Sequence, residues 1–126
     1  MTITDDLATI LGDWDEHPEA RAELLDALDY YQDHASELIA HQFLAAQIRP
    51  INLILAWPDA WPPYLDVPAD PPIRQTGVGK FPYKIIFQPR KTGIWVLAYA
   101  HTSRRPGYWA HRIANPSEPK MVYKNT

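Results

Sequence analysis

The stretch that decides the fold is FPYKIIFQPRKTGIWVLAYAHTSRRPGYWAHR, residues Phe81–Arg112. Its two apolar runs, Tyr83–Phe87 and Ile94–Ala100, are rich in the β-branched and aromatic residues that favour strands. The connector Gln88–Gly93 contains proline and glycine, so the stretch predicts a β-hairpin with a loop of five or six residues. Because both runs are nearly continuous rather than alternating, we expect two central strands covered on both faces.

Two helices are predicted before this hairpin. Pro18 suits the first turn of a helix, and apolar residues recur at helical spacing over Pro18–Asp33. Ser36 is a capping residue that predicts the start of a second helix, which Trp57-Pro58 should end. Pro50 falls inside this second helix, where we expect a kink or a break. The very short connection between the helices predicts an αα-hairpin.

The other segments give weaker signals. Residues 57–72 are proline-rich and contain no glycine, which predicts a stiff loop. Ile73–Gly79 is expected to form a weak strand with a glycine bulge, and Gly12–His17 a short first strand. Thr4 would cap a short helix in an N-terminal extension, residues 1–12, and Met121–Tyr123 would add a short edge strand.

Length and composition indicate one domain. A chain of 126 residues can bury a core without a disulfide or metal, and it contains no cysteine. No apolar run approaches the ~20 residues that a membrane span needs, and the acidic N-terminus does not resemble a secretory signal. We therefore expect a cytoplasmic protein with no membrane partner.

Charge is distributed unevenly along the chain. The first 71 residues carry a formal charge of −12, whereas residues 72–126 carry +9, although the whole chain sums to −3. Such asymmetry predicts a polar molecule with a basic face that attracts phosphates or an acidic partner. The alternative is a solvated sheet face balanced by acidic helices. We favour a functional face because its cations are interleaved with tyrosine and tryptophan.

The predicted hairpin ends in a cluster of residues that can bind or catalyse. Arginine grips phosphate or carboxylate bidentately, while tyrosine and tryptophan can stack on bases. For Trp109 core packing is the better interpretation, and for His101 a role in a turn is as reasonable as a role in chemistry. The candidate residues are His101, Arg104, Arg105, Tyr108, Trp109 and Arg112.

Other common sites are not indicated. Five histidines without cysteine, and without a metalloprotease pattern, do not predict a metal site. The chain has no glycine-rich phosphate loop before a helix and no serine in a nucleophile elbow. No cofactor is expected.

Several stretches resemble the RelE/ParE toxins of bacterial toxin–antitoxin modules. The similarity covers roughly residues 13–112 and departs in the N-terminal extension, the Pro50 interruption, the proline loop and the tail 113–126. The order of strand, helix hairpin and three strands also matches. The stretches that carry the resemblance are Glu19–Leu24 with Tyr30-Tyr31, Arg74 before Phe81-Pro82-Tyr83, and Val96-Leu97-Ala98 leading to His101, Arg104–Trp109 and Arg112.

The resemblance implies an α+β fold in which an N-terminal helix hairpin packs on a small twisted, mainly antiparallel β-sheet. It also implies a growth-inhibitory toxin that a cognate antitoxin neutralises in a hetero-oligomer. RelE-like members cut messenger RNA on the ribosome, and ParE-like members poison DNA gyrase. A third alternative is a non-toxic interaction protein of the same fold.

Each mechanism assigns the candidate residues differently. A RelE-like nuclease would use His101, Arg104, Arg105 and Tyr108 in catalysis. Nucleic-acid or target contacts would come from Lys80, Lys84, Arg90, Lys91, Trp109 and Arg112. We lean toward the gyrase mechanism or an unassigned one, because no second acid–base group is evident beside His101 and the acidic first half is a poor ribosome-docking surface.

The two adjacent arginines should divide their roles. Successive side chains on an extended segment alternate, so one arginine should turn toward the sheet and the other toward solvent. We expect Arg105 to be structural, stacked on Tyr108 or Trp109 or paired with a carboxylate. Arg104 is expected to face solvent and to meet the target or antitoxin.

Overall fold

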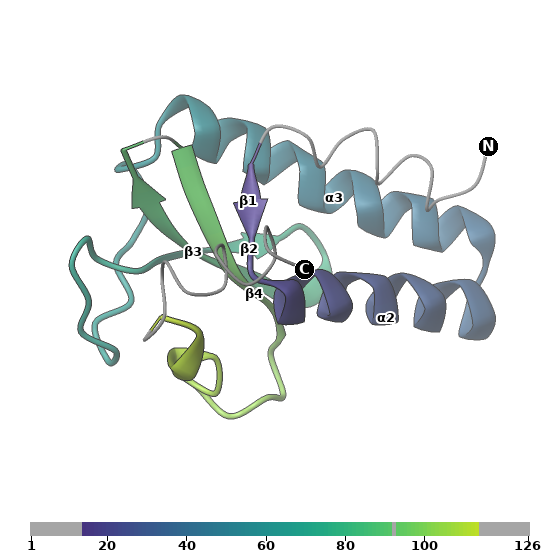
Figure 1. The fold of residues 1–126 in the computed structure, drawn as a ribbon. Coiled ribbons are helices and arrows are strands. Elements are labelled where there is room, and N and C mark those ends of the chain that lie inside the picture. Colours follow the sequence, from purple (N-terminus) through teal and green to yellow (C-terminus); the bar gives the residue numbers. More distant parts are fainter. Residues whose placement is uncertain (1–13, 92, 114–126) are drawn as a thin grey trace, which may run out of the picture.

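The computed structural model describes residues 14–91 and 93–113, which form an α+β fold of two helices and a four-stranded mixed sheet (Figure 1). The expected helix within residues 1–12 and the expected strand Met121–Tyr123 lie outside the described residues. In chain order the elements are β1 (Asp15–Glu16), α2 (Pro18–His34), α3 (Glu37–Ala56), β2 (Arg74–Val78), β3 (Phe81–Arg90), β4 (Gly93–His101) and the 3-10 turn η1 (Ala110–Arg112).

Capping residues define both helices, and the predicted roles of Pro18 and Ser36 at the two helix starts are confirmed. The Nδ1 atom of His17 accepts a hydrogen bond from the Glu19 N–H at 3.1 Å, directly before Pro18 opens α2. Ser36 caps α3 by accepting from the Ile39 N–H at 3.0 Å, and Trp57 is the C-cap. The two helices run side by side as the expected αα-hairpin (Figure 1).

α3 continues without interruption past Pro50, so the alternative of a break at this proline is wrong. Proline removes one backbone hydrogen bond from the helix. The residues on either side, Gln47, Ile51 and Ile54, are almost completely buried. Burial of these side chains holds the helix together across the missing bond.

The sheet has the order β1-β4-β3-β2, so β3 and β4 are central, as predicted. β1 is parallel to β4, and the other two pairings are antiparallel. The hairpin loop is shorter than predicted, because Pro89 pairs with Ile94 and Arg90 with Gly93. The fixed φ of proline is compatible with extended backbone. Pro89 therefore lies within β3, and not in the loop that the sequence predicted at this position. The register shift beside Gly77 confirms the irregularity expected in β2.

Apolar residues cover both faces of the central strands. On the helix side, Ile85 and Phe87 pack with Leu24, Phe43 and Ile54 of the helices. On the other face, which we call the loop side, the buried cluster contains Ile73, Ile86, Trp95, Leu97, Ala98, Ala100 and Trp109. Tyr64, Val67 and Ala69 of the proline-rich loop pack against this second cluster. The continuous apolar runs of β3 and β4 follow from this burial on both faces.

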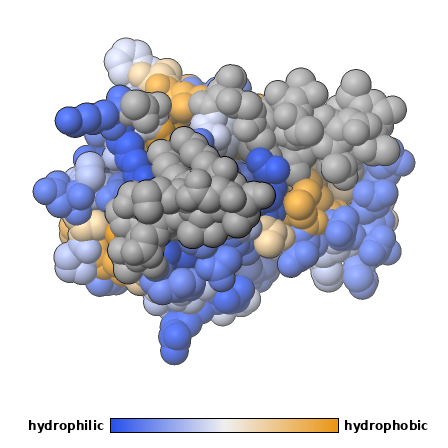
Figure 2. Space-filling view, in the orientation of Figure 1, coloured by the Kyte–Doolittle hydropathy of each residue, from blue (hydrophilic) through white to orange (hydrophobic). Residues whose placement is uncertain are grey.

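α3 is, among the described residues, the one helix long and apolar enough to cross a membrane by length and composition alone. The expectation that no segment approaches this length was therefore wrong. The mostly buried core helix of a soluble protein meets the same criterion, so one such helix is weak evidence for a membrane span. In α3, 33% of the apolar window is buried, and the buried apolar residues are Ala40, Phe43, Leu44, Ile51 and Ile54. The described part of the chain is organised like a small soluble domain. Figure 2 shows a largely hydrophilic face with small, separate hydrophobic patches.

Candidate functional site

A surface hollow of about 370 Å³ lies between α2 and the end of the sheet where β4 finishes. β3 starts at this end, since Tyr83 pairs with His101. We call this feature the helix-side hollow. It is lined by Glu23, Asp26, Ala27, Tyr30, Tyr31, Tyr83, Tyr99, His101, Arg104 and Tyr108. The sheet end and the turn after it therefore bring together three of the predicted residues, His101, Arg104 and Tyr108.

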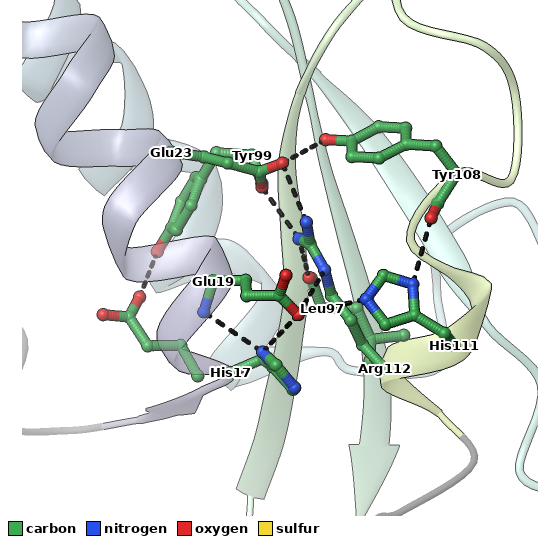
Figure 3. A network of polar contacts seen from close by, with 9 residues as sticks. His17, Glu19, Glu23, Leu97, Tyr99, Tyr108, His111 and Arg112 are labelled. Carbon is green, nitrogen blue, oxygen red and sulfur yellow. Dashed lines mark hydrogen bonds and ion pairs between the residues drawn. The ribbon is translucent and has the colours of Figure 1, made fainter.

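Glu23 of α2 is the centre of a polar network at the inner wall of this hollow (Figure 3). Its Oε1 atom accepts from the Tyr99 N–H at 3.1 Å and from the Arg112 guanidinium at 3.0 Å. Its Oε2 atom accepts a second bond from Arg112 at 3.2 Å and a bond from the Tyr108 hydroxyl. One carboxylate thus joins α2 to β4 and to the turn that follows it.

Arg112 lies inside this network and not on the surface. Its side chain is 5% exposed, and it donates to the Leu97 carbonyl at 2.8 Å in addition to Glu23. A guanidinium that is buried and bound at both Nη atoms by one carboxylate is not accessible to a ligand. Trp109 is also buried, at 1% exposure. Both residues were named as candidates for target contact, and in the structure both belong to the framework behind the site. For Trp109 this confirms core packing, the interpretation that the sequence favoured.

The Tyr108 hydroxyl is held in its protonated form. Burial, the hydrogen bond to Glu23 and the charge of Glu23 raise the pKa of Tyr108 well above its ordinary value. Tyr99 is fully buried and donates to Glu16 at 2.8 Å, so burial and the Glu16 carboxylate raise the pKa of Tyr99 as well. Neither phenol can act as a base in this state.

A second ion pair extends the network toward η1. His111 contacts Glu19 at 3.0 Å through its Nε2 atom, and Arg112 approaches the same carboxylate at 3.6 Å. The hydrogen bond from His111 lowers the pKa of Glu19, and the charge of Arg112 adds to this effect although burial opposes it. These contacts hold η1 against the first turn of α2 (Figure 3).

His101 is engaged in local contacts at the rim of the hollow. Its Nδ1 atom accepts from the Ser103 N–H at 3.0 Å and lies 2.7 Å from the Ser103 hydroxyl. Its ring meets the Tyr83 ring edge-on, with centroids 5.0 Å apart. The structure therefore shows the turn-forming role that the sequence left open for His101.

The expected division of roles between Arg104 and Arg105 is reversed. The Arg104 guanidinium lies over the Tyr108 ring, 3.9 Å from its centroid. Arg105 is exposed, and no ion pair or ring contact joins its side chain to another described residue. The alternation of side chains expected for an extended strand does not apply to Arg104, because the chain has left β4 and turns at this point. In this turn the Arg104 N–H donates to the His101 carbonyl at 3.0 Å.

A second, smaller hollow of about 120 Å³ lies on the loop side of the same sheet end. Its cationic residues are Lys84, Arg104 and Arg105, with His101 between the two hollows. Lys80 precedes β3 at this end. Arg90 and Lys91 lie at the opposite end of the hairpin, roughly 20 Å from Lys84 along the strand. Arg90 instead stacks on Trp95, and burial lowers its pKa.

The sequence did not identify Glu23, Asp26 or the tyrosines of α2 as parts of a site. Acidic residues on a helix are usually solvated, and Tyr30-Tyr31 resembled ordinary core packing. The partners of Glu23 are 76 to 89 residues away in the chain, so no local pattern reveals them. The one local signal is the placement of Glu19 and Glu23 on the same face of α2.

No protein-family model and no curated protein matches this chain. Within residues 14–91 and 93–113, no three histidine or acidic residues come together in a group that could hold a metal ion. The class that the fold and site define is a small α+β protein with an aromatic, mixed-charge hollow at one end of its sheet.

Proposed function

We propose that this protein is the toxin component of a type II toxin–antitoxin module, that it acts in the cytoplasm, and that a cognate antitoxin neutralises it in a hetero-oligomer. We further propose that it acts by binding a protein target, for which DNA gyrase is our candidate. The family resemblance motivates the first proposal, and the coarse α+β arrangement is compatible with it.

One observation supports a binding mechanism over RNA cleavage: the acid–base groups of the site already engage one another. Tyr108 is bound to Glu23, Arg112 is buried against the same carboxylate, and His101 is bound to Ser103. RNA cleavage needs a base, an acid and charge stabilisation that converge on one phosphate. In the helix-side hollow, Glu23 is already bound to Arg112, and the Asp26 carboxylate would repel such a phosphate.

The loop-side hollow favours the alternative, a ribosome-dependent messenger RNA endoribonuclease. Lys84, Arg104 and Arg105 could grip phosphate there, and His101 lies at the boundary of the two hollows. Under this alternative His101 would have to exchange its bond with Ser103 for one to the substrate.

The deciding experiment is induction of the full chain in bacteria, alone and together with the small open reading frame next to its gene. We expect growth arrest that the neighbouring gene product relieves. Purified protein should then cause gyrase-dependent double-strand breaks while messenger RNA on translating ribosomes stays intact. Cut messenger with unaffected gyrase would favour the nuclease, and growth without arrest in a compatible host would favour a non-toxic interaction protein.

A further inference from the structure

The helix-side hollow is rich in tyrosines and carboxylates, which the resemblance of the chain to the RelE/ParE toxins does not predict. Five of its lining residues are tyrosines, and two, Glu23 and Asp26, are carboxylates. Aromatic faces attract cations through their quadrupole, and carboxylates attract them through charge. We propose that this hollow binds the guanidinium or ammonium group of a basic side chain presented by a partner protein.

The hollow already accommodates one cation of this kind. The exposed guanidinium of Arg104 lies over the Tyr108 ring at 3.9 Å, and the Arg112 guanidinium lies 5.3 Å from the same ring centroid. Tyr108 therefore offers a face that a planar cation can occupy. Because Arg104 is exposed and belongs to a turn, a ligand cation can take its place without disturbing the core.

The two carboxylates of the hollow differ in whether another side chain pairs with them. Glu23 is neutralised by Arg112, with which it forms two hydrogen bonds. Asp26 lies one turn along α2, is exposed, and has no ion pair or hydrogen bond from its side chain to any other described residue. Asp26 therefore adds an unpaired negative charge to a hollow whose other unpaired charge is the Arg104 guanidinium. A ligand cation that displaces Arg104 from the Tyr108 ring would enter the hollow that this carboxylate lines.

The size and position of the hollow fit a side chain from a protein segment. About 370 Å³ is enough for one arginine side chain, and it is at the lower end for a drug-sized ligand. Arginine and tyrosine are the residues most often found at energetic centres of protein interfaces. The proposal concerns the chemistry of this surface and holds whether or not the chain is a toxin.

The test uses the full isotope-labelled chain and two small probes, observed by amide chemical-shift changes in NMR spectra. N-acetyl-arginine amide should shift signals of the residues lining the hollow, and binding should weaken with salt. N-acetyl-citrulline amide has the same shape without the charge, and it should bind at least about threefold more weakly. Equal binding of both probes, or shifts elsewhere in the molecule, would overturn the proposal.

Two pairs of variants sharpen the result. Asp26→Asn should weaken arginine binding about threefold, whereas Asp29→Asn, an equally exposed change on α2 outside the hollow, should not. Arg104→Ala should strengthen binding because it removes a competing cation, and Arg105→Ala should leave it unchanged. Arginine binding that is unchanged or weaker in Arg104→Ala would contradict the proposal, and phosphate ions shifting the same signals more strongly than arginine would identify an anion site instead.

Discussion

Glu23 shows how one residue can join three elements of a small protein. Its carboxylate accepts from the backbone of β4, from the Tyr108 hydroxyl and from the buried Arg112 guanidinium. The Glu23–Arg112 ion pair adds little net free energy of folding, because burying both ions costs desolvation free energy. Removing one partner is costly, since the other charge then stays buried without compensation.

We therefore expect Glu23→Gln to lower the free energy of unfolding by about 3–5 kcal/mol, because the buried Arg112 loses its counter-ion. Urea denaturation followed by circular dichroism measures this change. Asp26→Asn is the matched control on the same helix, and as an exposed change it should stay within about 0.5 kcal/mol. A loss in Glu23→Gln no larger than in the control would contradict the assignment of Glu23 as the structural anchor.

The two arginines after β4 should behave unequally in the same assay. Arg104→Ala loses its stacking on Tyr108, which is worth about 0.5–1 kcal/mol at an exposed position. Arg105→Ala should remain within about 0.5 kcal/mol of the parent. A larger loss of stability in Arg105→Ala than in Arg104→Ala would instead support the expectation from the sequence, in which Arg105 is the structural arginine.

The candidate site was partly predictable at this scale. The sequence placed His101, Arg104 and Tyr108 together, because they follow one strand within a short turn. It could not place Glu23 against Arg112, since that contact depends on how α2 packs on the sheet. Burial of Arg112 depends on the same packing, so the sequence counted this arginine as a surface group, whereas the core packing favoured for Trp109 is confirmed.

At the scale of elements, the start of α2 contains a pH-sensitive cap. The neutral His17 ring accepts the Glu19 N–H, and burial lowers the pKa of His17 below 6.5 despite the nearby Glu19 carboxylate. As the pH falls below about 6.5, the unfolded chain takes up this proton before the folded chain does. Folded stability should therefore decrease through this window, and protonation at Nδ1 would remove the cap.

His17→Asn should reduce this pH dependence, because asparagine caps helices well and does not titrate. The measurement compares the free energy of unfolding at pH 7.5 and pH 5.5. Glu19 does not interfere, since its lowered pKa moves its own contribution to the region below 4.5. His34→Asn, at the other end of α2, is the control that should keep the parental difference. An unchanged pH dependence in His17→Asn would exclude the cap as its source.

Element boundaries followed from the sequence where local chemistry decides them. Pro18, Ser36 and Trp57-Pro58 mark helix ends because capping and proline geometry act within a few residues. A break at Pro50 and a loop at Pro89 were wrong predictions, since tertiary packing carries α3 and β3 through positions that a local rule treats as breaks.

At the scale of the whole molecule, β3 and β4 separate two buried clusters that share one sheet. Ile54 belongs to the helix-side cluster, and Ile73 belongs to the loop-side cluster. The loop-side cluster is covered by the irregular segment 57–72 and by the turn that contains Trp109. Within the described residues, no helix longer than η1 packs on this cluster. Its stability therefore depends on the central strands, which the helices hold in place from the other face.

This arrangement predicts one cooperative unfolding transition for both clusters. Ile54→Val and Ile73→Val each remove one buried methyl group and should each cost about 0.5–1.5 kcal/mol. Because the two sites lie on opposite faces of the sheet, the double variant should show the sum of the two losses within about 0.5 kcal/mol. Denaturation should be followed in the far-ultraviolet, which reports the helices, and by tryptophan fluorescence. The fluorescence is measured in a background where Trp14, Trp57 and Trp61 are replaced by phenylalanine, so that Trp95 and Trp109 on the loop side are the remaining reporters. Coincident curves for all variants are expected; a fluorescence transition that moves ahead of the helical signal in Ile73→Val alone would show that the loop side unfolds as a separate unit.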